Sequence, residues 1–489
     1  MDGPSGLDLA RDKMRDAGVP DVAIKVFEHG YHLLEEGATG ILPESDVEPL
    51  TDVADAHDFD AEPDDAAREA LGRTALIKLN GGLGTSMGMD RAKSLLPVRG
   101  ELTFLDVIAR QVLAAREEHG VRLPLVLMNS FRTRDDSLAA LERYPDLAVD
   151  GVPQDFLQNR EPKLLADDLT PVEWPQDPSL EWCPPGHGDL YTALQSSGVL
   201  DALRQAGFRY AAVSNADNLG SAPSAAMAGW FASTGAGFGA EVARRTPADR
   251  KGGHLVVRAS DHRIVLRETS QVADDDKDAA SDIERHAFFN TNNLWLDLDR
   301  LAALLEEKGG VLPLPLIRNE KTVDPSDGSS PRVIQIETAM GAAIELFDDA
   351  AVIEVGRERF LPVKTTDDLL RLRSDVYALG DDGTLRATVP EPEITLDPEH
   401  YRTVGAFDAH FPHGVPSLVL AESLTVEGDW TFGDRVSVVG PARLTAPDDG
   451  APATVPDDAT VGGDGVVEPE AKRDVPVDLS DLDGGVTDA

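Results

Sequence analysis

The segment LNGGLGTSMGMDRAKS, residues 79–94, is the strongest chemical signal in the sequence, and it directly follows a predicted strand. Its glycines at 81, 82, 84 and 88 leave space for backbone N–H groups to approach phosphate oxygens and a nucleobase edge. The segment is not a P-loop, and Met87 stands where the dinucleotide-binding fingerprint has its third glycine. Lys93 adds a cation that suits phosphate charge. The pattern predicts a nucleotide cradle, with a plain strand-to-helix turn as the alternative.

The segment WCPPGHGDLY, residues 182–191, places His187 between two glycines at a turn. Asp189 is expected to cap a helix that begins there, so that His187 and the helix N-terminus clamp an anion. A structural histidine is the alternative, since a lone histidine in a loop more often packs than binds. Cys183 is interpreted as a small packed residue, because no general base is identifiable for it.

The segment SNADN, residues 214–218, ends the predicted strand 210–214. In an open α/β sheet the carboxyl ends of the strands face the ligand crevice. Asp217 would therefore direct a carboxylate oxygen at bound phosphates, as Mg²⁺ requires. Asp217 is the metal candidate, and an Asx-turn at the strand end is the alternative.

Three further polar segments interrupt apolar sequence. NTNNLW, residues 290–295, sets amides beside an aromatic ring and suits sugar hydroxyls, although a β-turn would also explain it. Glu337 is expected at the N-terminus of a helix, as a cap or a hydroxyl acceptor. Lys364 precedes a predicted helix and again suits a phosphate.

Short apolar runs alternate with amphipathic helical patterns from residue 71 to 378, which predicts an α/β domain on a mostly parallel sheet. Thr103 and Asp106 have the spacing of a capping box and mark the start of its first helix. Residues 1–70 are expected to form a helical extension, with Ile24, Phe27 and Tyr31 apolar at helical spacing. The predicted strands are residues 75–79, 123–128, 210–214, 255–259, 264–267 and 288–298.

Apolar residues recur at every second position in the later part of the chain, among them Leu424, Val426 and Phe432. Residues 379–445 are therefore predicted to form a small β domain, either a left-handed β-helix or a plain β-meander. Residues 446–489 are rich in Asp, Pro, Gly and Val with little periodicity, and are expected to be an acidic flexible tail.

The net charge of −43 excludes two function classes, because such a field repels phosphate backbones and anionic lipid heads. The charge is spread along the chain and favours either a salt-tolerant source or an Asp- and Arg-rich bacterium. One cysteine permits no intramolecular disulfide. The first residues show no apolar h-region and nowhere do about 18 apolar residues run together, so neither secretion nor membrane spanning is expected. A cytoplasmic protein is expected, with small-molecule partners and neither a nucleic acid nor a membrane.

Eight segments of the chain, in this order, resemble the eukaryotic-type UTP–glucose-1-phosphate uridylyltransferases, or UDP-glucose pyrophosphorylases. They cover about residues 75–380 and read LNGGLGTSMG with AKS, LTFLD, LMNSF, PPGHGDLY, SNADNLG, NTNNLW, IQIETAMGAA and RFLPVKTTDDLL. The resemblance implies a nucleotidyltransferase domain with a Rossmann-like mixed sheet, an N-terminal helical extension and a C-terminal left-handed β-helix. The N-terminal segment and residues after about 400 depart from the family's usual sequence, which leaves the oligomeric state open.

The resemblance also implies roles for individual residues, with Lys93 and Lys364 as the catalytic cations and Asp217 as the Mg²⁺ ligand. The residues implied for the nucleotide are Leu79, Asn80, Gly81, Gly82, Lys93, Gln158, Gly188, Asn215, Asp217 and Lys364. The residues implied for the sugar phosphate are His187, Asn215, Ala216, Asp217, Asn293 and Glu337.

The implied reaction transfers a uridylyl group from UTP to glucose 1-phosphate and gives UDP-glucose and pyrophosphate. Both substrates are polyanions, so positioning and charge neutralisation would supply most of the catalysis without a covalent nucleophile. Two alternatives stay open. One is a relative that accepts N-acetylhexosamine 1-phosphate or several sugar 1-phosphates, and the other is a nucleotide-sugar-binding protein without turnover.

Overall fold

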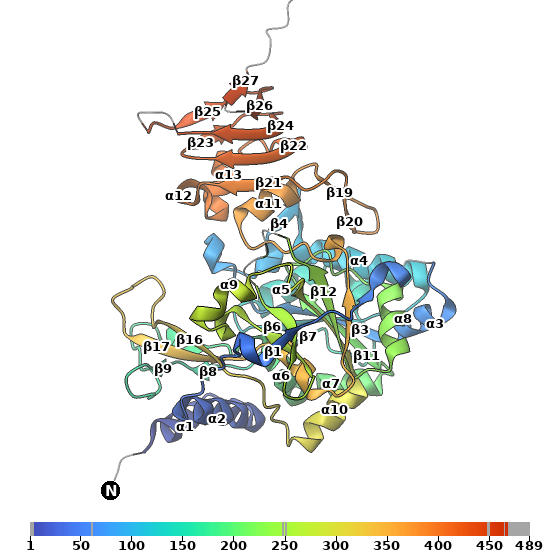
Figure 1. Cartoon of the computed structure of the whole chain (residues 1–489), viewed down its shortest axis with the longest axis vertical. Helices are drawn as coiled ribbons and strands as arrows, with labels where there is room; N and C mark the ends of the chain where they lie inside the picture. The colour runs from blue at the N-terminus through green and yellow to red at the C-terminus, as the bar shows by residue number, and fades with distance from the viewer. Residues whose placement is uncertain are drawn as a thin grey trace, which may run out of the picture. The chain divides into compact units, whose positions relative to one another are not determined.

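A computed structural model of the chain describes residues 4–59, 62–246, 249, 252–446, 450–463 and 465–467 (Figure 1). The chain divides into two compact units. Unit 1 is Met1–Val363 with Ala378–Arg386, and unit 2 is Lys364–Tyr377 with Ala387–Ala489. The sequence predicts domains made of continuous segments. In the structure, residues 378–386 instead belong to unit 1, although the chain has already entered unit 2 at Lys364. No helix in the described part of the chain combines the length and apolar character needed to span a bilayer.

A mixed β-sheet forms the centre of unit 1. Strands β7, β6, β3 and β11 are parallel, whereas β15 runs antiparallel to both β11 and β12. The mixed α/β architecture is as predicted. In spatial order the strands are β2 (Ala54–Asp55), β18 (Ala351–Glu354), β12 (Phe238–Arg244), β15 (Phe288–Asp297), β11 (Tyr210–Asn215), β3 (Thr74–Asn80), β6 (Leu125–Asn129) and β7 (Asp155–Leu157). The flanking strands are β1 (Val47–Pro49), β13 (His254–Arg258) and β14 (Ile264–Arg267).

Helices cover both faces of this sheet, because successive side chains of a strand point to opposite faces. Ala211 and Val213 of β11 belong to a core that also contains residues of α6 (Leu190–Ser196), α7 (Val199–Gln205) and α10 (Leu298–Glu307). On the other face, the Phe231 ring of α8 (Ala225–Thr234) lies 5.6 Å from the Tyr210 ring. The remaining longer helices of this region are α3 (Asp65–Gly72), α4 (Phe104–His119) and α5 (Arg134–Leu141).

The start of α4 confirms the predicted capping box. Thr103 Oγ1 accepts a hydrogen bond from Asp106 N, and the Asp106 carboxylate accepts one from Thr103 N. Gly120 follows the helix with a left-handed φ of 65°, which ends it. The helix and its N-terminus therefore follow from local sequence alone.

The N-terminal residues are helical only in part. Helices α1 (Gly6–Asp16) and α2 (Asp21–Glu35) pack their apolar faces on Ile334 and Ile336 of β17 (Arg332–Glu337), which pairs with β16 (Ile317–Thr322) and β9 (Leu164–Leu165). Residues 47–49 and 54–55, inside the predicted helical extension, are instead strands β1 and β2 of the central sheet. Val47 is buried there against Val256 and Val265, a long-range contact that local periodicity does not reveal.

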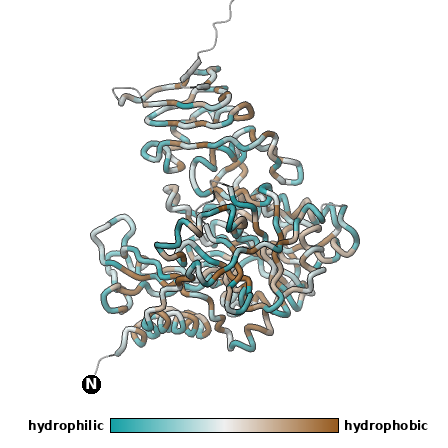
Figure 2. Tube along the Cα trace, in the orientation of Figure 1, coloured by the Kyte–Doolittle hydropathy of each residue, from teal (hydrophilic) through white to brown (hydrophobic). Residues whose placement is uncertain are grey.

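Unit 2 stacks short parallel strands, which lie in successive layers in Figure 1. Figure 2 shows hydrophobic residues interspersed with hydrophilic ones along these layers. Parallel pairing excludes the β-meander alternative, whose neighbouring strands are antiparallel; the left-handed coil stays a prediction. The strands are β21 (Glu393–Leu396), β22 (Ser417–Val426), β24 (Ser437–Leu444) and β26 (Thr460–Gly463), with β23 (Trp430–Phe432) on β25 (Ala453–Val455) and β27 (Gly465–Val467) antiparallel to β26.

The β region continues beyond residue 445, where the sequence analysis ends it. Strands β25 and β26 occupy part of the segment that is expected to be a flexible tail, and Val455 and Val461 are fully buried there. Apolar residues six positions apart among Asp, Pro and Gly are too sparse for a helical or alternating pattern to stand out. Residues 468–489 of the expected tail lie outside the described residues. The helices of unit 2 are α11 (Thr366–Arg373), α12 (Pro398–Tyr401) and α13 (Val404–His410).

Candidate functional site

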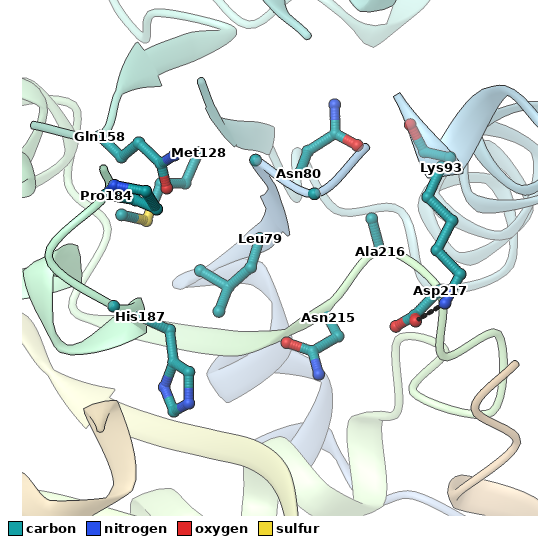
Figure 3. A pocket seen from close by; sticks show the side chains of 14 residues that line it. Leu79, Asn80, Lys93, Met128, Gln158, Pro184, His187, Asn215, Ala216 and Asp217 are labelled. Atoms are coloured by element: carbon teal, nitrogen blue, oxygen red, sulfur yellow. Dashed lines mark hydrogen bonds and ion pairs between the residues drawn. The ribbon is translucent and has the colours of Figure 1, made fainter. Parts of the chain in front are cut away.

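The carboxyl ends of β3 and β11 border a cavity of about 310 Å³ in unit 1. The strands are parallel, and Leu79 of β3 pairs in register with Asn215 of β11, so the residues that follow them meet at one sheet edge. Figure 3 shows Lys93 and Asp217 at one end of the cavity and Gln158 and His187 at the other. Ten residues predicted from the sequence line it: Leu79, Asn80, Gly81, Gly82, Lys93, Gln158, His187, Asn215, Ala216 and Asp217.

The glycine-rich loop lies against two other parts of the cavity wall. A Cβ atom at Gly81 would lie 2.7 Å from the Gln158 side-chain oxygen, so the Gln158 amide approaches the loop backbone closely and would have to move if residue 81 had a side chain. Gly84 adopts the left-handed φ of 65° that non-glycine residues rarely adopt. The loop closes where Lys93 N donates a hydrogen bond to Gly82 O at 3.0 Å. These features hold a loop with little side-chain bulk at the carboxyl end of β3, as the cradle prediction requires.

Lys93 and Asp217 form an ion pair at the edge of the cavity. The Lys93 ammonium lies 2.6 Å from Asp217 Oδ2 and also donates to the backbone carbonyl of Val363. Their side chains are 17% and 21% exposed, so both can be reached from the cavity. The structure thus brings the predicted phosphate cation and the predicted metal ligand into direct contact. A phosphate that binds the Lys93 ammonium would replace the Asp217 carboxylate as its partner. The carboxylate would then be available to bind a cation.

His187 is a neutral hydrogen-bond donor at this site. Its Nδ1 accepts a hydrogen bond from Met340 N at 2.9 Å, and burial lowers the pKa of the imidazole to about 4. The ring is therefore uncharged at neutral pH, and its single proton resides on Nε2. The histidine that lines the cavity can donate this proton in a hydrogen bond to an anion without carrying a charge.

Asp189 does not cap the following helix, contrary to the prediction. Its carboxylate accepts hydrogen bonds from Asn159 N at 2.6 Å and from the Asn159 side-chain amide at 2.7 Å, and it makes no cap bond. Burial raises the pKa of Asp189 to about 7. Because Asn159 follows Gln158, Asp189 ties the Gln158 loop to the His187 turn. A partner 30 residues away could not be read from local spacing.

The two glycines of the His187 turn both lie against Thr338. Gly186 lines the cavity with a φ of 77°, whereas Gly188, the residue implied for the nucleotide, donates its N–H to Thr338 O at 2.8 Å. A Cβ atom at Gly188 would lie 2.2 Å from Thr338 Oγ1. Both glycines therefore pack closely on Thr338, and a contact of Gly188 with the nucleotide stays a prediction.

Glu337, Asn293 and Lys364 do not line the cavity. Glu337 ends strand β17 and accepts a hydrogen bond from the Asn319 amide at 2.9 Å, so its predicted position at a helix N-terminus is wrong. The residues after it form a 3₁₀ helix only from Met340. Lys364 belongs to unit 2, where its backbone N–H donates to Asp368.

Asn293 belongs to a buried network of charged and amide side chains in unit 1. Its amide donates to Glu241 Oε2 at 3.0 Å and accepts a hydrogen bond from the Asn218 amide at 3.1 Å. The Arg359 guanidinium spans both oxygens of the Glu241 carboxylate at 2.8 Å, and Trp295 Nε1 donates to Glu241 Oε1. Burial raises the pKa of Glu241, but Arg359 and the hydrogen bonds lower it more, so the pKa lies below its usual value.

Lys78 is a second buried charge that the sequence analysis overlooks. Its ammonium donates to Ser214 Oγ at 2.8 Å, to Ser221 Oγ at 2.7 Å and to Ser221 O at 3.0 Å. Burial lowers the pKa of Lys78 to about 7. A lysine inside the apolar strand TALIKLN, and a glutamate inside FGAEVAR, are the signals that would have revealed this network. Four further lining residues, Ser94, Met128, Pro184 and Gly186, were not predicted.

Comparison with known proteins agrees with this geometry. The family model described as UTP–glucose-1-phosphate uridylyltransferase matches residues 25–439. Enzymes of that name from Solanum tuberosum and Saccharomyces cerevisiae are 38% and 39% identical to this chain, over 82% and 77% of it and 83% and 75% of their own lengths. A mutant UDP-glucose pyrophosphorylase from Leishmania major, solved in complex with UDP-glucose, is 40% identical, with a TM-score of 0.87 over 94% of this chain and 98% of that one. The chain therefore belongs to the UTP–glucose-1-phosphate uridylyltransferase family.

Proposed function

We propose that this chain transfers a uridylyl group from UTP to glucose 1-phosphate and releases UDP-glucose and pyrophosphate. The observation that carries the proposal is the single cavity where three separate sequence motifs meet, which are the glycine loop, the His187 turn and the residues that follow β11. The relatives' names and the UDP-glucose in the Leishmania major structure support the same reaction. The expected partners are these small molecules, and the expected compartment is the cytoplasm.

The reaction is a direct displacement at phosphorus. A phosphate oxygen of glucose 1-phosphate attacks the α-phosphorus of UTP, a new P–O bond forms, and the bond to the bridging oxygen of the β-phosphate breaks as pyrophosphate leaves. No side chain needs to form a covalent intermediate. The protein's contribution is to hold two mutually repelling anions in line and to neutralise their charge, which are the main sources of rate in phosphoryl and nucleotidyl transfer.

The cavity residues divide between the two ends seen in Figure 3. The amide of Gln158 and the loop at Gly81 and Gly82 suit a nucleobase edge, because they present hydrogen-bonding groups beside a surface without side-chain bulk. Lys93 suits the triphosphate. His187 Nε2–H would donate a hydrogen bond to the sugar phosphate.

Asp217 fits a Mg²⁺ ion. Mg²⁺ binds through one or two carboxylates together with substrate phosphates, and Asp217 presents one carboxylate at the cavity, beside the cation that would contact the phosphates. When bound, the ion would neutralise charge on the phosphate oxygens. Exchange of Lys93 from Asp217 to a phosphate would make the carboxylate available, so binding of the nucleotide and the metal would be coupled.

Lys364 is proposed as a second phosphate cation, on the basis of the family resemblance and its position in sequence directly after Val363, whose carbonyl accepts from Lys93. An interaction made mainly in the transition state affects kcat, so Lys364→Ala should lower kcat about 10²-fold with little change in KM. Steady-state kinetics would test this, and an unchanged kcat would remove Lys364 from the mechanism. Asn293, Glu337 and Gly188 stay predicted substrate contacts that lie outside the cavity lining.

Pyrophosphate release from UTP, measured across a panel of sugar 1-phosphates with and without Mg²⁺, tests the proposed function. Turnover with glucose 1-phosphate well above the other sugars is expected. A preference for N-acetylhexosamine 1-phosphate, or equal use of several sugars, would support the broader family alternative. Tight binding of UDP-glucose without any pyrophosphate release would instead indicate a binding protein.

A further inference from the structure

Two histidines and an aspartate converge in unit 2, among residues that no part of the proposed reaction uses. His400 belongs to α12, His410 ends α13, and Asp429 lies in the turn between β22 and β23. One side-chain ligand atom from each lies within 4.8 Å of the other two. All three side chains are half-buried.

The hydrogen bonds of His410 define which of its nitrogens is available. His410 Nδ1 lies 2.7 Å from Ala406 O, and a carbonyl can only accept, so Nδ1 carries a proton. His410 Nε2 lies 3.0 Å from Asp429 Oδ1. A lone pair on Nε2 would repel an ionised carboxylate at this distance, so either a proton or a metal cation lies between the two atoms.

We propose that His400, His410 and Asp429 bind a divalent transition-metal ion, with zinc favoured by the ligand set. Two imidazole nitrogens and one carboxylate oxygen are common zinc ligands, at bond lengths of about 2.0–2.2 Å, and a water molecule would complete a tetrahedron. Ligand atoms of a tetrahedral site lie about 3.3 Å apart at these bond lengths, close to the observed separation of Nε2 and Oδ1. The bond from Nδ1 to Ala406 O is the outer contact that orients metal-binding histidines.

The ion would tie the two short helices to the first layers of the β stack. Two other contacts join the same parts. Asp397 accepts hydrogen bonds from Glu399 N in α12 and from Gly428 N, and the buried Tyr401 hydroxyl donates to Trp430 O. Stacked-strand domains need a capped end, because each layer packs only on its neighbours. The metal therefore stabilises unit 2 and has no role in the chemistry of the cavity, so this inference does not depend on the proposed function.

Zinc binding by the full-length protein tests the proposal. The −43 net charge attracts cations non-specifically, so calorimetry is carried out at high KCl with excess Mg²⁺. The wild type is expected to bind one more equivalent of zinc than His400→Gln, and zinc should raise the thermal transition of the wild type but not that of the variant. His413→Gln is the matched control, because His413 is an exposed histidine of the same unit outside the cluster. It should behave as the wild type.

Asp429→Asn provides a second variant in case His400→Gln does not fold, and Co²⁺ in place of zinc provides a direct spectroscopic readout. The wild type should show the visible absorption of four-coordinate Co²⁺, and Asp429→Asn should lose it. Equal zinc stoichiometry in the wild type and either variant would overturn the proposal. It would mean that a proton, and not a metal ion, lies between His410 Nε2 and Asp429 Oδ1.

Discussion

Unit 1 contains two groups of charged side chains near the carboxyl ends of β3 and β11, and they differ in what surrounds them. The cavity pair, Lys93 and Asp217, is partly exposed, and each charge has a partner that a substrate could replace. In the second group, the enclosed network around Lys78, Glu241 and Arg359, the Lys78 and Glu241 side chains are buried, and Arg359, which is 16% exposed, contacts both oxygens of the Glu241 carboxylate. We propose that the partly exposed pair takes part in the chemistry and that the enclosed network holds the strands that position it.

The largest expected effect is a loss of stability when the enclosed network is broken. Glu241→Ala leaves the Arg359 guanidinium without the carboxylate that both of its arms contact, and removing one partner of a buried ion pair costs about 3–5 kcal/mol. Denaturant unfolding should show this loss, whereas the exposed Glu69→Ala should change the unfolding free energy by less than about 0.5 kcal/mol. A loss below about 1 kcal/mol for Glu241→Ala would mean that the network is not structural.

Removing the cation of the cavity pair should affect activity and leave stability nearly unchanged. Lys93→Ala is expected to lower kcat/KM for UTP by about 10²–10³, because it deletes a charge that faces the developing charge of the phosphates. The loss of a partly exposed ion pair costs little folding free energy. Lys25→Ala, on the exposed face of α2, serves as the control. If Lys93→Ala shows normal turnover, the cavity pair does not contribute to activity as proposed.

Lys78 gives the enclosed network a pH signature. Burial lowers its pKa to about 7, so above this pH the unfolded chain binds the proton more tightly than the folded one, and stability rises as the pH increases toward 10.5. Between pH 7 and 9 the wild type should gain about 2 kcal/mol relative to Lys78→Met. Unfolding free energies of both proteins at the two pH values measure this. An equal pH dependence for the two would show that Lys78 is charged in the folded protein at pH 9.

The smallest expected effect concerns His187, whose imidazole should not change its protonation state near neutral pH. Burial lowers the pKa of His187 to about 4, so the ligand-free imidazole should remain neutral from pH 8 down to about pH 5. A lowered pKa also means that its contribution to stability is present above pH 6.5 and is lost as the pH falls toward 4. NMR of the ring nitrogens measures the protonation state directly. A midpoint near 6.5 would contradict a neutral Nε2 donor.

The sequence predicts much of the cavity because its residues follow strands within continuous motifs. The glycine loop and Asp217 could be placed at strand ends from the α/β pattern, whereas Leu79, Asn80 and Asn215 were implied by the family resemblance. Residues whose role depends on distant partners could not be placed in this way. Asp189 binds Asn159, 30 residues away, rather than its own helix.

The same reason accounts for the differences in the fold. The capping box at Thr103 is local and was predicted correctly, whereas β1 depends on contacts with Val256 and Val265 more than 200 residues away. Val455 and Val461 belong to layers whose apolar positions are widely spaced, and this region was expected to be a flexible tail. Local periodicity reveals an element only when the residues that bury it are close in sequence.

The central claim is that the cavity at the ends of β3 and β11 holds both substrates, and a crystal structure of the protein with UDP-glucose tests it most directly. We predict the uracil beside Gln158 and Gly81, the phosphates near Lys93, and the sugar phosphate within hydrogen-bonding distance of His187 Nε2. UDP-glucose bound elsewhere, with the Lys93–Asp217 pair intact and the cavity empty, would contradict the account.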